Sequence, residues 1–426
     1  WTGIPGFIDP DYQENFWQPV PQHLWGEVPA ADLAGSERAA LMPVGYGPFV
    51  LVDASGDTFT LARNPNYFRA GEGFPRVDQL VFRVVGQDSE ANLDMLRTAE
   101  CDLLDTSASA AIPADEAVAL AESGELIASW ANHNGWTLLN FGVVPQSYDG
   151  DYSMWAGDRP DFFGDARVRQ AIAYCLDREA IVAEASYGVA PVMDSFVQPD
   201  HALFNPDVAV YRQDLETASD LLDEVGWVLN ADGQRVASEI EGINNGTPFS
   251  FELLYPGYAE NARVIEIVSD QLAACGIEAI PVAMTDEELF ATGEDAPIFG
   301  RNFDMAYFAW QSAEQPPCQL FVGEAIPGAD EDRFPYKWGG WNPTGWQNEA
   351  YDAACLAARG GAPGIGDYAA NHALAQQILS EELPVIPMYS YQHAALARPE
   401  VCGLQLDPTA GLLWNIEEIG IGEACP

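Results

Sequence analysis

The 426-residue chain is 48% hydrophobic and 19% charged, which argues against disorder and predicts a folded protein of two or more domains. Its 65 acidic and 18 basic residues give a formal net charge of -47, which argues against a nucleic-acid partner because phosphate binding needs clustered Lys and Arg. No apolar run approaches the roughly 18 residues of a membrane-spanning helix, so we expect a soluble chain whose export signal lies outside it.

The first 135 residues combine short strands with one clear helix. Alternating apolar and polar residues predict strands over 49–53, 58–62 and 79–85. The helical pattern of residues 89–98 follows these strands. This part of the chain is therefore predicted to be mixed α/β.

Two later helices are marked by acidic caps. Asp165 precedes an amphipathic helix whose apolar face includes Cys175, which we expect to be a buried thiol. Asp214 precedes a second helix that ends at Gly226. The polar, Gly- and Asn-rich segment 230–247 comes next and is predicted to be a surface loop.

A strand, a helix and a second strand follow one another over residues 249–284. The first strand is expected over 249–255 and the last over 277–284, and Gly276 ends the helix between them where a left-handed residue is needed. A connection this tight predicts a parallel strand pair, and therefore an α/β lobe.

Signatures of catalysis are absent from the sequence. It contains no Gly-x-Ser-x-Gly elbow, no His-Glu-x-x-His pair and no phosphate-binding Gly-x4-Gly-Lys loop. Its five histidines are dispersed, and its close acid pairs do not form a calcium loop. We therefore expect neither an enzyme nor a resident metal or cofactor.

The seven cysteines lack the spacing of zinc ligands, so disulfides in an oxidising compartment are the better interpretation. Because seven is an odd number, at least one cysteine must be free or paired with a segment outside the chain.

Several short motifs occur in one order along nearly the whole chain. GYGPF at 45–49 and LARNPNYF at 61–68 look like a GTGPY and RNPxYW pair, and AECDLL at 99–104 is similar to a "sGevDll" segment. FGDARVRQAI at 163–172 looks like an "fxDxrVRqAi" helix. Together these motifs resemble the family 5 extracellular solute-binding proteins, which serve ABC importers of dipeptides, oligopeptides and nickel. Later motifs that agree lie at 303–310, 348–352, 383–388 and 401–404.

The resemblance implies a two-lobed α/β fold of the periplasmic-binding-protein type (type II, large oligopeptide-binding class), with mixed sheets flanked by helices. Residues 1–134 would form the middle of lobe one, 135–395 lobe two, and 396–426 a return to lobe one. The crossings near Trp136 and Leu396 would form the hinge. Members of the family carry an N-terminal part that we expect to be absent from this chain.

The resemblance also implies a ligand site between the lobes. Its best candidate segment is 307–314, in which Trp310 and Gln311 would face the ligand. In peptide-binding relatives an Asp three residues after this Trp holds the ligand ammonium group, but that position is Ala313 here. Either Glu314 supplies the carboxylate or the ligand has no amino terminus to bind.

Other aromatic residues are weaker candidates for this site. Trp136 near the hinge and Tyr46 in the 45–47 turn are both candidate ligand contacts, and the alternative for Tyr46 is a packed turn residue. Trp341 and Trp346 flank a Pro-Thr-Gly turn and are expected to be structural. By resemblance, Cys318 is expected to pair with Cys355, and a second disulfide is expected between Cys402 and Cys425.

These observations predict a substrate-binding component of an ABC importer, which captures a small solute, most readily a peptide, and delivers it to a membrane permease. An oligosaccharide ligand and a surface or assembly subunit are the alternatives. A separate N-terminal chain is a further possible partner. The expected location is extracellular or periplasmic, with a lipid anchor possible through the missing N-terminal part.

Overall fold

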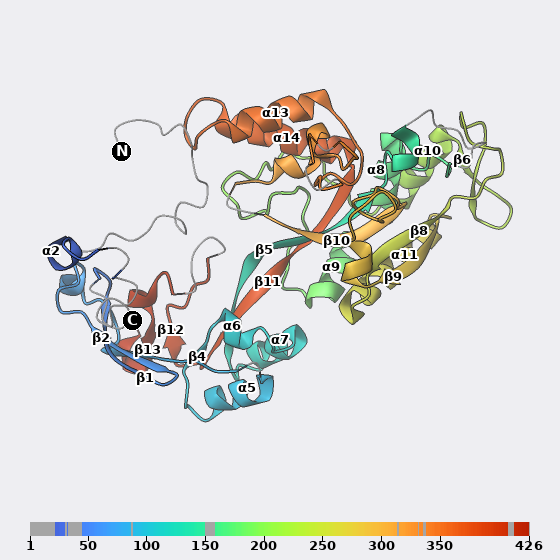
Figure 1. The fold of residues 1–426 in the computed structure, drawn as a ribbon. Coiled ribbons are helices and arrows are strands. Elements are labelled where there is room, and N and C mark those ends of the chain that lie inside the picture. Colours follow the sequence, from blue (N-terminus) through green and yellow to red (C-terminus); the bar gives the residue numbers. More distant parts are fainter. Residues whose placement is uncertain are drawn as a thin grey trace. The chain divides into compact units, whose positions relative to one another are not determined.

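The computed structural model (Figure 1) falls into two compact units. Unit 1 contains Asn134–Tyr391, and unit 2 contains the described parts of Asp11–His133 and Gln392–Pro426. The residues that the structure describes are 22–29, 32, 45–86, 88–149, 158–312, 315–330, 332–334, 338–407 and 413–425.

Unit 2 contains a three-stranded antiparallel sheet of β1 (Phe49–Ser55), β2 (Thr58–Arg63) and β3 (Gln79–Arg83). It also holds α2 (Gln22–Trp25), α5 (Ser89–Arg97), α6 (Thr106–Ser109), α7 (Ala114–Glu122) and the strand pair β12 (Val401–Cys402) and β13 (Gly420–Ile421). A small apolar core includes Leu93, Leu96 and Leu120. The strands and the helix predicted for the first 135 residues are therefore present.

Five strands of a six-stranded mixed sheet lie wholly or partly in unit 1, and the sixth, β4, lies in unit 2. Its strand order is β4-β11-β5-β10-β8-β9. The two long strands, β5 (Ile127–Phe141) and β11 (Val385–Ala397), each pass from one unit to the other. The other strands are β4 (Leu103–Leu104), β8 (Ser250–Pro256), β9 (Glu278–Met284) and β10 (Met305–Gln311).

The predicted strand-helix-strand unit is present. β8 and β9 are parallel in the register Ser250↔Glu278 to Pro256↔Met284, and α11 (Ala259–Ala274) connects them. Gly276 ends the connection at a φ of +79°, where a Cβ atom would lie 2.8 Å from the Gly233 carbonyl oxygen. A side chain at this position would therefore be strained and crowded.

Two aspartates begin helices as the sequence predicts. Asp165 accepts a bond from the Arg167 amide at the start of α8 (Ala166–Cys175). Asp214 accepts from Thr217 at the start of α10 (Leu215–Val225), which ends at left-handed Gly226. The remaining long helices are α9 (Arg178–Ser186), α13 (Glu349–Arg359) and α14 (Tyr368–Glu382), and Figure 1 shows α13 and α14 side by side.

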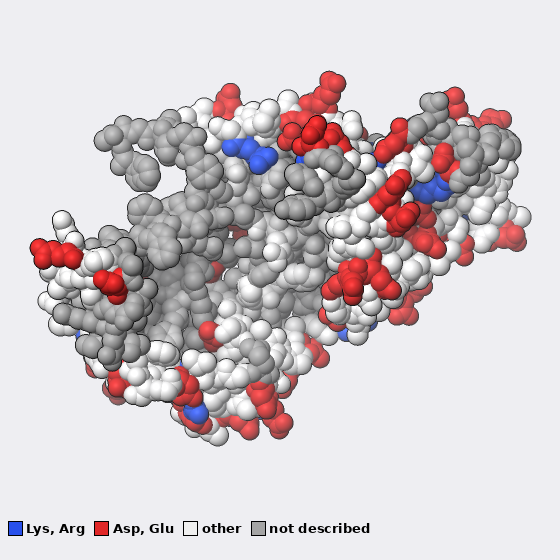
Figure 2. Space-filling view, in the orientation of Figure 1, with Lys and Arg blue, Asp and Glu red and all other residues white. Residues whose placement is uncertain are grey.

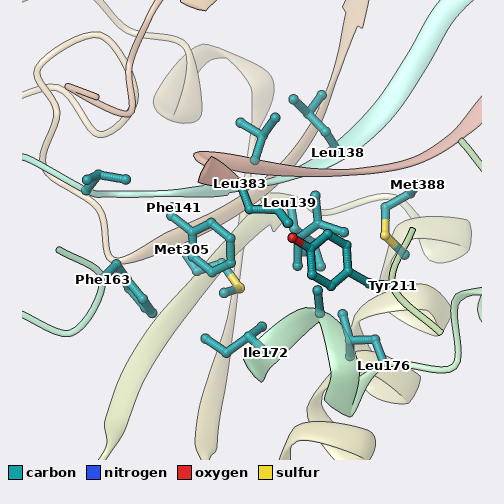
Figure 3. Packing of buried hydrophobic residues seen from close by; sticks show 14 of the residues in the cluster. Leu138, Leu139, Phe141, Phe163, Ile172, Leu176, Tyr211, Met305, Leu383 and Met388 are labelled. Atoms are coloured by element: carbon teal, nitrogen blue, oxygen red, sulfur yellow. The ribbon is translucent and has the colours of Figure 1, made fainter. Parts of the chain in front are cut away.

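The main core lies between this sheet and α8. Figure 3 shows Leu139 and Phe141 of β5 and Met305 of β10 on the side of Ile172 of α8 and of Leu176, which directly follows this helix. All five side chains are fully buried. At about 25 cal/mol per Å² of apolar surface removed from water, each such side chain stabilises the fold by roughly 1.5–3 kcal/mol.

Arg169 anchors α8 to the rest of unit 1. Its guanidinium is 1% exposed and donates to the carbonyl oxygens of Phe163, Glu382 and Leu383. Burial lowers the pKa of Arg169 to about 10, so the group remains charged at neutral pH. A buried cation with this many acceptors fixes the orientation of α8 against the end of α14.

Two expectations from the sequence are wrong. Cys175 is not a thiol, because it forms a disulfide with Cys275 that joins α8 to the end of α11, with the two Cα atoms 6.2 Å apart. The segment 230–247 is not simply a loop, because β6 (Trp227–Leu229) and β7 (Arg235–Ala237) form a hairpin. Arg235 is 2% exposed and donates to Asp223, Ser219 and the Cys275 carbonyl, which a surface loop would not provide.

Most of the basic residues in the described part of the chain form ion pairs with acidic side chains. Arg178 lies 2.5 Å from Asp194, and Arg159 lies 3.0 Å from Asp304. On the face in Figure 2, acidic side chains are spread widely and basic ones are few. The net charge of -47 is therefore expressed mainly as solvated surface carboxylates.

Candidate functional site

One edge of the unit 1 sheet gathers the carboxyl ends of three strands. β10 runs parallel to β8, with Met305 opposite Leu253, and β8 runs parallel to β9. The last residues of these strands, Gln311, Pro256 and Met284, therefore lie at the same edge. In open α/β sheets, ligands bind beyond the carboxyl ends of the strands, so this edge is the candidate site.

β10 changes from core to surface along its length. Met305 to Phe308 are buried, Ala309 and Trp310 are half-buried, and Gln311 is exposed. The strand thus carries its last side chains out of the hydrophobic core and toward the edge.

Two tryptophans face each other on neighbouring strands at this edge. β10 and β5 are antiparallel, and Trp310 is the direct partner of Trp136. Directly opposite residues place their side chains on the same face of a sheet. Trp136 is 0% exposed and packs edge-on against Phe321, with ring centroids 6.5 Å apart.

Trp310 belongs to an aromatic group that reaches the surface. Its ring lies edge-on to Phe308 at 5.5 Å and to Trp341 at 5.8 Å. Phe308 is buried, whereas Trp341 is 52% exposed. An indole supported on one side by the core and open on the other can stack against an apolar or planar ligand group.

The same edge concentrates hydrogen-bonding groups that have no partner. Twelve buried side-chain nitrogen and oxygen atoms in the described part of the chain lack a hydrogen-bond partner. Three of them are the Trp136 Nε1, the Trp310 Nε1 and the Ser312 Oγ. Trp136 and Trp310 are paired across the strands, and Ser312 is two residues beyond Trp310. Buried polar groups without a hydrogen-bond partner are rare in folded proteins, so these three groups are candidates for hydrogen bonds to a ligand.

A hollow of about 450 Å³ lies beside the ends of β8 and β9. Its lining includes Tyr258, Thr285 and the carboxylates Asp286 and Glu288. Both carboxylates are already used within the protein, since the Tyr258 hydroxyl donates to Asp286 and Thr285 forms a capping box with Glu288. The hollow thus gives this edge a concave surface, and its two carboxylates stabilise the local fold.

Buried hydroxyl groups support the sheet beneath the two tryptophans. The Tyr307 and Tyr389 hydroxyl oxygens are 3.1 Å apart, and the Thr137 hydroxyl donates to the Tyr389 carbonyl at 3.2 Å. Burial raises the pKa of both tyrosines, so they stay neutral. These contacts stabilise the strands and provide no acid or base for chemistry at the edge.

The structure brings together some of the residues predicted for the site. Trp136 and Trp310 are paired, and exposed Gln311 lies opposite Gly135. Tyr46 is 77% exposed and belongs to unit 2, so it is not the packed turn residue of the alternative interpretation. Glu314 lies outside the described residues.

Sequence reasoning missed Trp341. Trp341 and Trp346 were both expected to be structural, and Trp346 is buried as expected. Trp341 is half exposed and contacts Trp310, so it joins the candidate site. The only signal in the sequence was that Trp341 precedes a turn. A turn does not show whether a neighbouring tryptophan ring is buried or exposed.

Disulfides are present at Cys318–Cys355, the pair implied by the family resemblance, and at Cys402–Cys425, the pair expected because the two cysteines bracket the terminal strands. The first holds the short helix η4 (Cys318–Phe321) against α13, and the Tyr351 hydroxyl donates to the Cys318 carbonyl at 2.7 Å. Because Phe321 packs against Trp136, this disulfide helps to fix the floor of the candidate site. Cys101 is the free cysteine within the described residues.

The described ranges show neither a cluster of metal ligands nor a helix able to span a membrane. They contain no group of three His, Cys, Asp or Glu residues placed to hold an ion. Among the helices of these same ranges, none combines the length and the apolar character needed to cross a bilayer.

Known structures share this fold. The structure described as MppA, a periplasmic murein tripeptide binding protein in an unliganded open form, matches with a TM-score of 0.67 and 16% identity, over 95% of this chain and 67% of that one. The oligopeptide-binding protein AppA of Bacillus subtilis, in complex with a nonapeptide, matches with a TM-score of 0.52 and 22% identity, over 95% of this chain and 72% of that one. The predicted two-lobed, periplasmic-binding-protein-like fold class is confirmed.

Curated relatives match in sequence over part of their length. The oligopeptide-binding protein AppA of Bacillus subtilis (strain 168) is 27% identical over 264 residues, which cover 61% of this chain and 43% of AppA. The oligopeptide-binding protein OppA of Lactococcus lactis subsp. lactis is 24% identical over 413 residues, which cover 95% of this chain and 63% of OppA. The chain thus spans less than two thirds of these relatives.

A family model settles the relationship. The model described as "Bacterial extracellular solute-binding proteins, family 5 Middle" matches residues 12–323, which is more than half of the chain. The order of motifs along the sequence, the mixed sheet and the structural matches agree with it. This chain belongs to the bacterial extracellular solute-binding proteins of family 5.

Proposed function

We propose that the chain binds a peptide outside the cytoplasmic membrane and presents it to an ABC permease. The observation that carries this proposal is the carboxyl edge of β10, where half-buried Trp310, exposed Gln311 and half-exposed Trp341 meet unpaired hydrogen-bond donors. Such an edge offers ring faces for side chains and donors for backbone oxygens, which is the combination that a peptide requires. Two relatives, AppA and OppA, are oligopeptide-binding proteins, which supports the same ligand class.

We also propose that the two passages between the units, in β5 and β11, act as the hinge of the protein. Two strand crossings allow two lobes to turn while each keeps its own core. A bound peptide would then stabilise one arrangement only through its better contacts in it.

Native mass spectrometry of the full chain with a mixture of short synthetic peptides, from dipeptides to nonapeptides, tests the ligand class. The expected result is a complex of one chain with one peptide, whose affinity is then measured by calorimetry. A parallel mixture of linear oligosaccharides serves as the comparison. Binding of a sugar with no binding of peptide would replace the peptide proposal with the oligosaccharide alternative, and self-assembly with neither ligand would favour an assembly subunit.

The variant Trp310→Ala locates the site. Trp310 is half-buried near the end of β10, so we expect at least a tenfold loss of peptide affinity, in the range of an aromatic hot spot. Trp227→Phe is the matched control, because Trp227 is a buried tryptophan of unit 1 on β6 and outside this edge. Equal loss in both variants would mean that the effect comes from the fold and not from the site.

A further inference from the structure

The unpaired donors at the end of β10 have a defined arrangement. Trp136 and Trp310 are direct partners across two antiparallel strands, so their side chains leave the sheet on the same face. The indole nitrogens of both residues are buried and lack an acceptor in the described structure, and so does the Ser312 hydroxyl two residues further on. Two of these unpaired groups thus lie on residues paired across the strands, and the third lies two residues beyond Trp310.

This arrangement is particular to the edge and is not a general property of buried tryptophans. Trp227 and Trp346 are 1% and 5% exposed in the same unit, and neither indole nitrogen is among the twelve unpaired atoms of the described residues. A buried N–H group without an acceptor destabilises a fold by roughly 1–3 kcal/mol. Phe would fill much of the same space without this cost, so the two unpaired indoles are unfavourable for the fold alone.

The chemistry of the indole fixes what can pair with it. The indole N–H is a donor only, and it cannot accept a bond from an ammonium or amide N–H group. The partner must therefore be an acceptor such as a carboxylate or carbonyl oxygen.

We infer that the end of β10 recognises an oxygen acceptor of the bound peptide, either its terminal carboxylate or a backbone carbonyl, through the N–H groups of Trp136 and Trp310 and the Ser312 hydroxyl. The inference rests on the proposed peptide-binding function. It adds that the ligand group at this position is a hydrogen-bond acceptor. Trp136, which is 0% exposed and would otherwise count as core, becomes a specificity-determining residue.

The test uses Trp136→Phe in the full chain with the tightest peptide from the mixture above. Phe keeps an aromatic ring at this position and removes the donor, so we expect an affinity loss of about five- to tenfold. Trp227→Phe, which removes an indole away from this edge, is expected to bind as wild type does. Equal affinity of wild type and Trp136→Phe would overturn the inference.

Two forms of the same peptide, with a free carboxylate and with a C-terminal amide, identify the acceptor. If the carboxylate is the partner, amidation weakens binding to wild type and has a smaller effect on Trp136→Phe. If a backbone carbonyl is the partner, amidation has no effect and the loss in Trp136→Phe is the same for both forms. Binding of no peptide by wild type would instead reject the proposed function itself.

A second substitution protects the test against misfolding. Benzothienylalanine at position 136 keeps the bicyclic shape of Trp and replaces its N–H group with sulfur. We expect the same five- to tenfold loss from it as from Trp136→Phe. Full affinity with this residue would show that the ring shape matters and the donor does not, which would overturn the inference.

Discussion

At its amino end β10 is enclosed by the core of unit 1, and at its carboxyl end it is only half covered. Met305 is 0% exposed and packs with Phe141 and Ile172, whereas Trp310 is half-buried and Gln311 is exposed. The seven residues of one strand thus serve two purposes. The comparison teaches that the stability of this unit and its ability to bind a ligand depend on different residues and can be tested separately.

The largest expected loss of stability follows removal of the disulfide that joins α8 to α11, the helices beside the buried end of β10. Cys175 and Cys275 close a loop with a sequence separation of 100 residues. The variant Cys175→Ala/Cys275→Ala is expected to lose about 4–5 kcal/mol of unfolding free energy, measured by urea denaturation. The peptide affinity of the remaining folded protein should not change.

The control for this variant is Cys402→Ala/Cys425→Ala, which opens a separation of 23 residues in unit 2. Its expected loss is about 3 kcal/mol, because a shorter loop restricts the unfolded chain less. A larger loss from the short loop than from the long one would contradict the chain-entropy explanation.

Substitutions at the two ends of β10 separate its contribution to stability from its contribution to ligand binding. Met305→Ala is expected to lower the unfolding free energy by about 3 kcal/mol, since it opens a cavity in the core, and to leave peptide affinity within twofold. Trp310→Ala is expected to do the reverse, with at least tenfold weaker binding and a smaller change in stability. The account would be wrong if Met305→Ala weakened binding of the folded protein as much as Trp310→Ala did.

His372 on α14 is another place in unit 1 where a buried group is unpaired, and it lies outside the candidate site. It is 0% exposed, and neither ring nitrogen has a partner in the described structure. Burial lowers its pKa from 6.5 to about 4, so the folded state keeps the ring neutral. Between these two pKa values the His372 ring is protonated in the unfolded state and neutral in the folded state. The free energy of unfolding therefore decreases as the pH falls.

The total effect of His372 is at most about 3 kcal/mol, and it should appear between about pH 6.5 and pH 4. Urea denaturation of wild type and His372→Leu at several pH values measures it. The variant is expected to lose that part of the pH dependence and to keep wild-type peptide affinity. An unchanged pH dependence would show that His372 is not responsible.

The smallest effect is expected for Gln311→Ala. Gln311 is exposed at the last position of β10, so the unfolding free energy should stay within about 0.5 kcal/mol of wild type. If its amide contacts the peptide, affinity should fall by about threefold, which is the loss of one hydrogen bond to a partly solvated group. If Gln311→Ala binds with wild-type affinity, Gln311 does not contact the peptide, and the tryptophans alone remain as candidate contacts.

Local sequence signals predicted much of the fold. Asp165, Asp214 and Gly276 each act on the neighbouring backbone, so their effect is visible in a few residues of sequence. The Cys175–Cys275 disulfide was missed because it joins residues 100 positions apart, and only the packing of α8 and α11 brings them together. The hairpin at 227–237 was missed because its stability depends on buried Arg235, a long-range contact.

The candidate site was predictable in position but not in detail. Family motifs placed Trp310, and the register of β5 and β10 was needed to show that Trp136 is its partner. The burial of Trp136 and the exposure of Trp341 could not be predicted from their sequence context. Both depend on which face of the sheet is covered, and that information lies in the packing of segments distant in sequence.

Hydrogen–deuterium exchange of the full chain, with and without saturating peptide, tests the central claim most directly. The account predicts that protection on binding within unit 1 is strongest at the end of β10, over fragments that contain Trp310 and Gln311, and at Trp341. Fragments that contain Met305 and α8 should exchange equally in both samples, because the core already protects them. Binding of the peptide with no protection at the end of β10 would contradict the assignment of this edge as the ligand site.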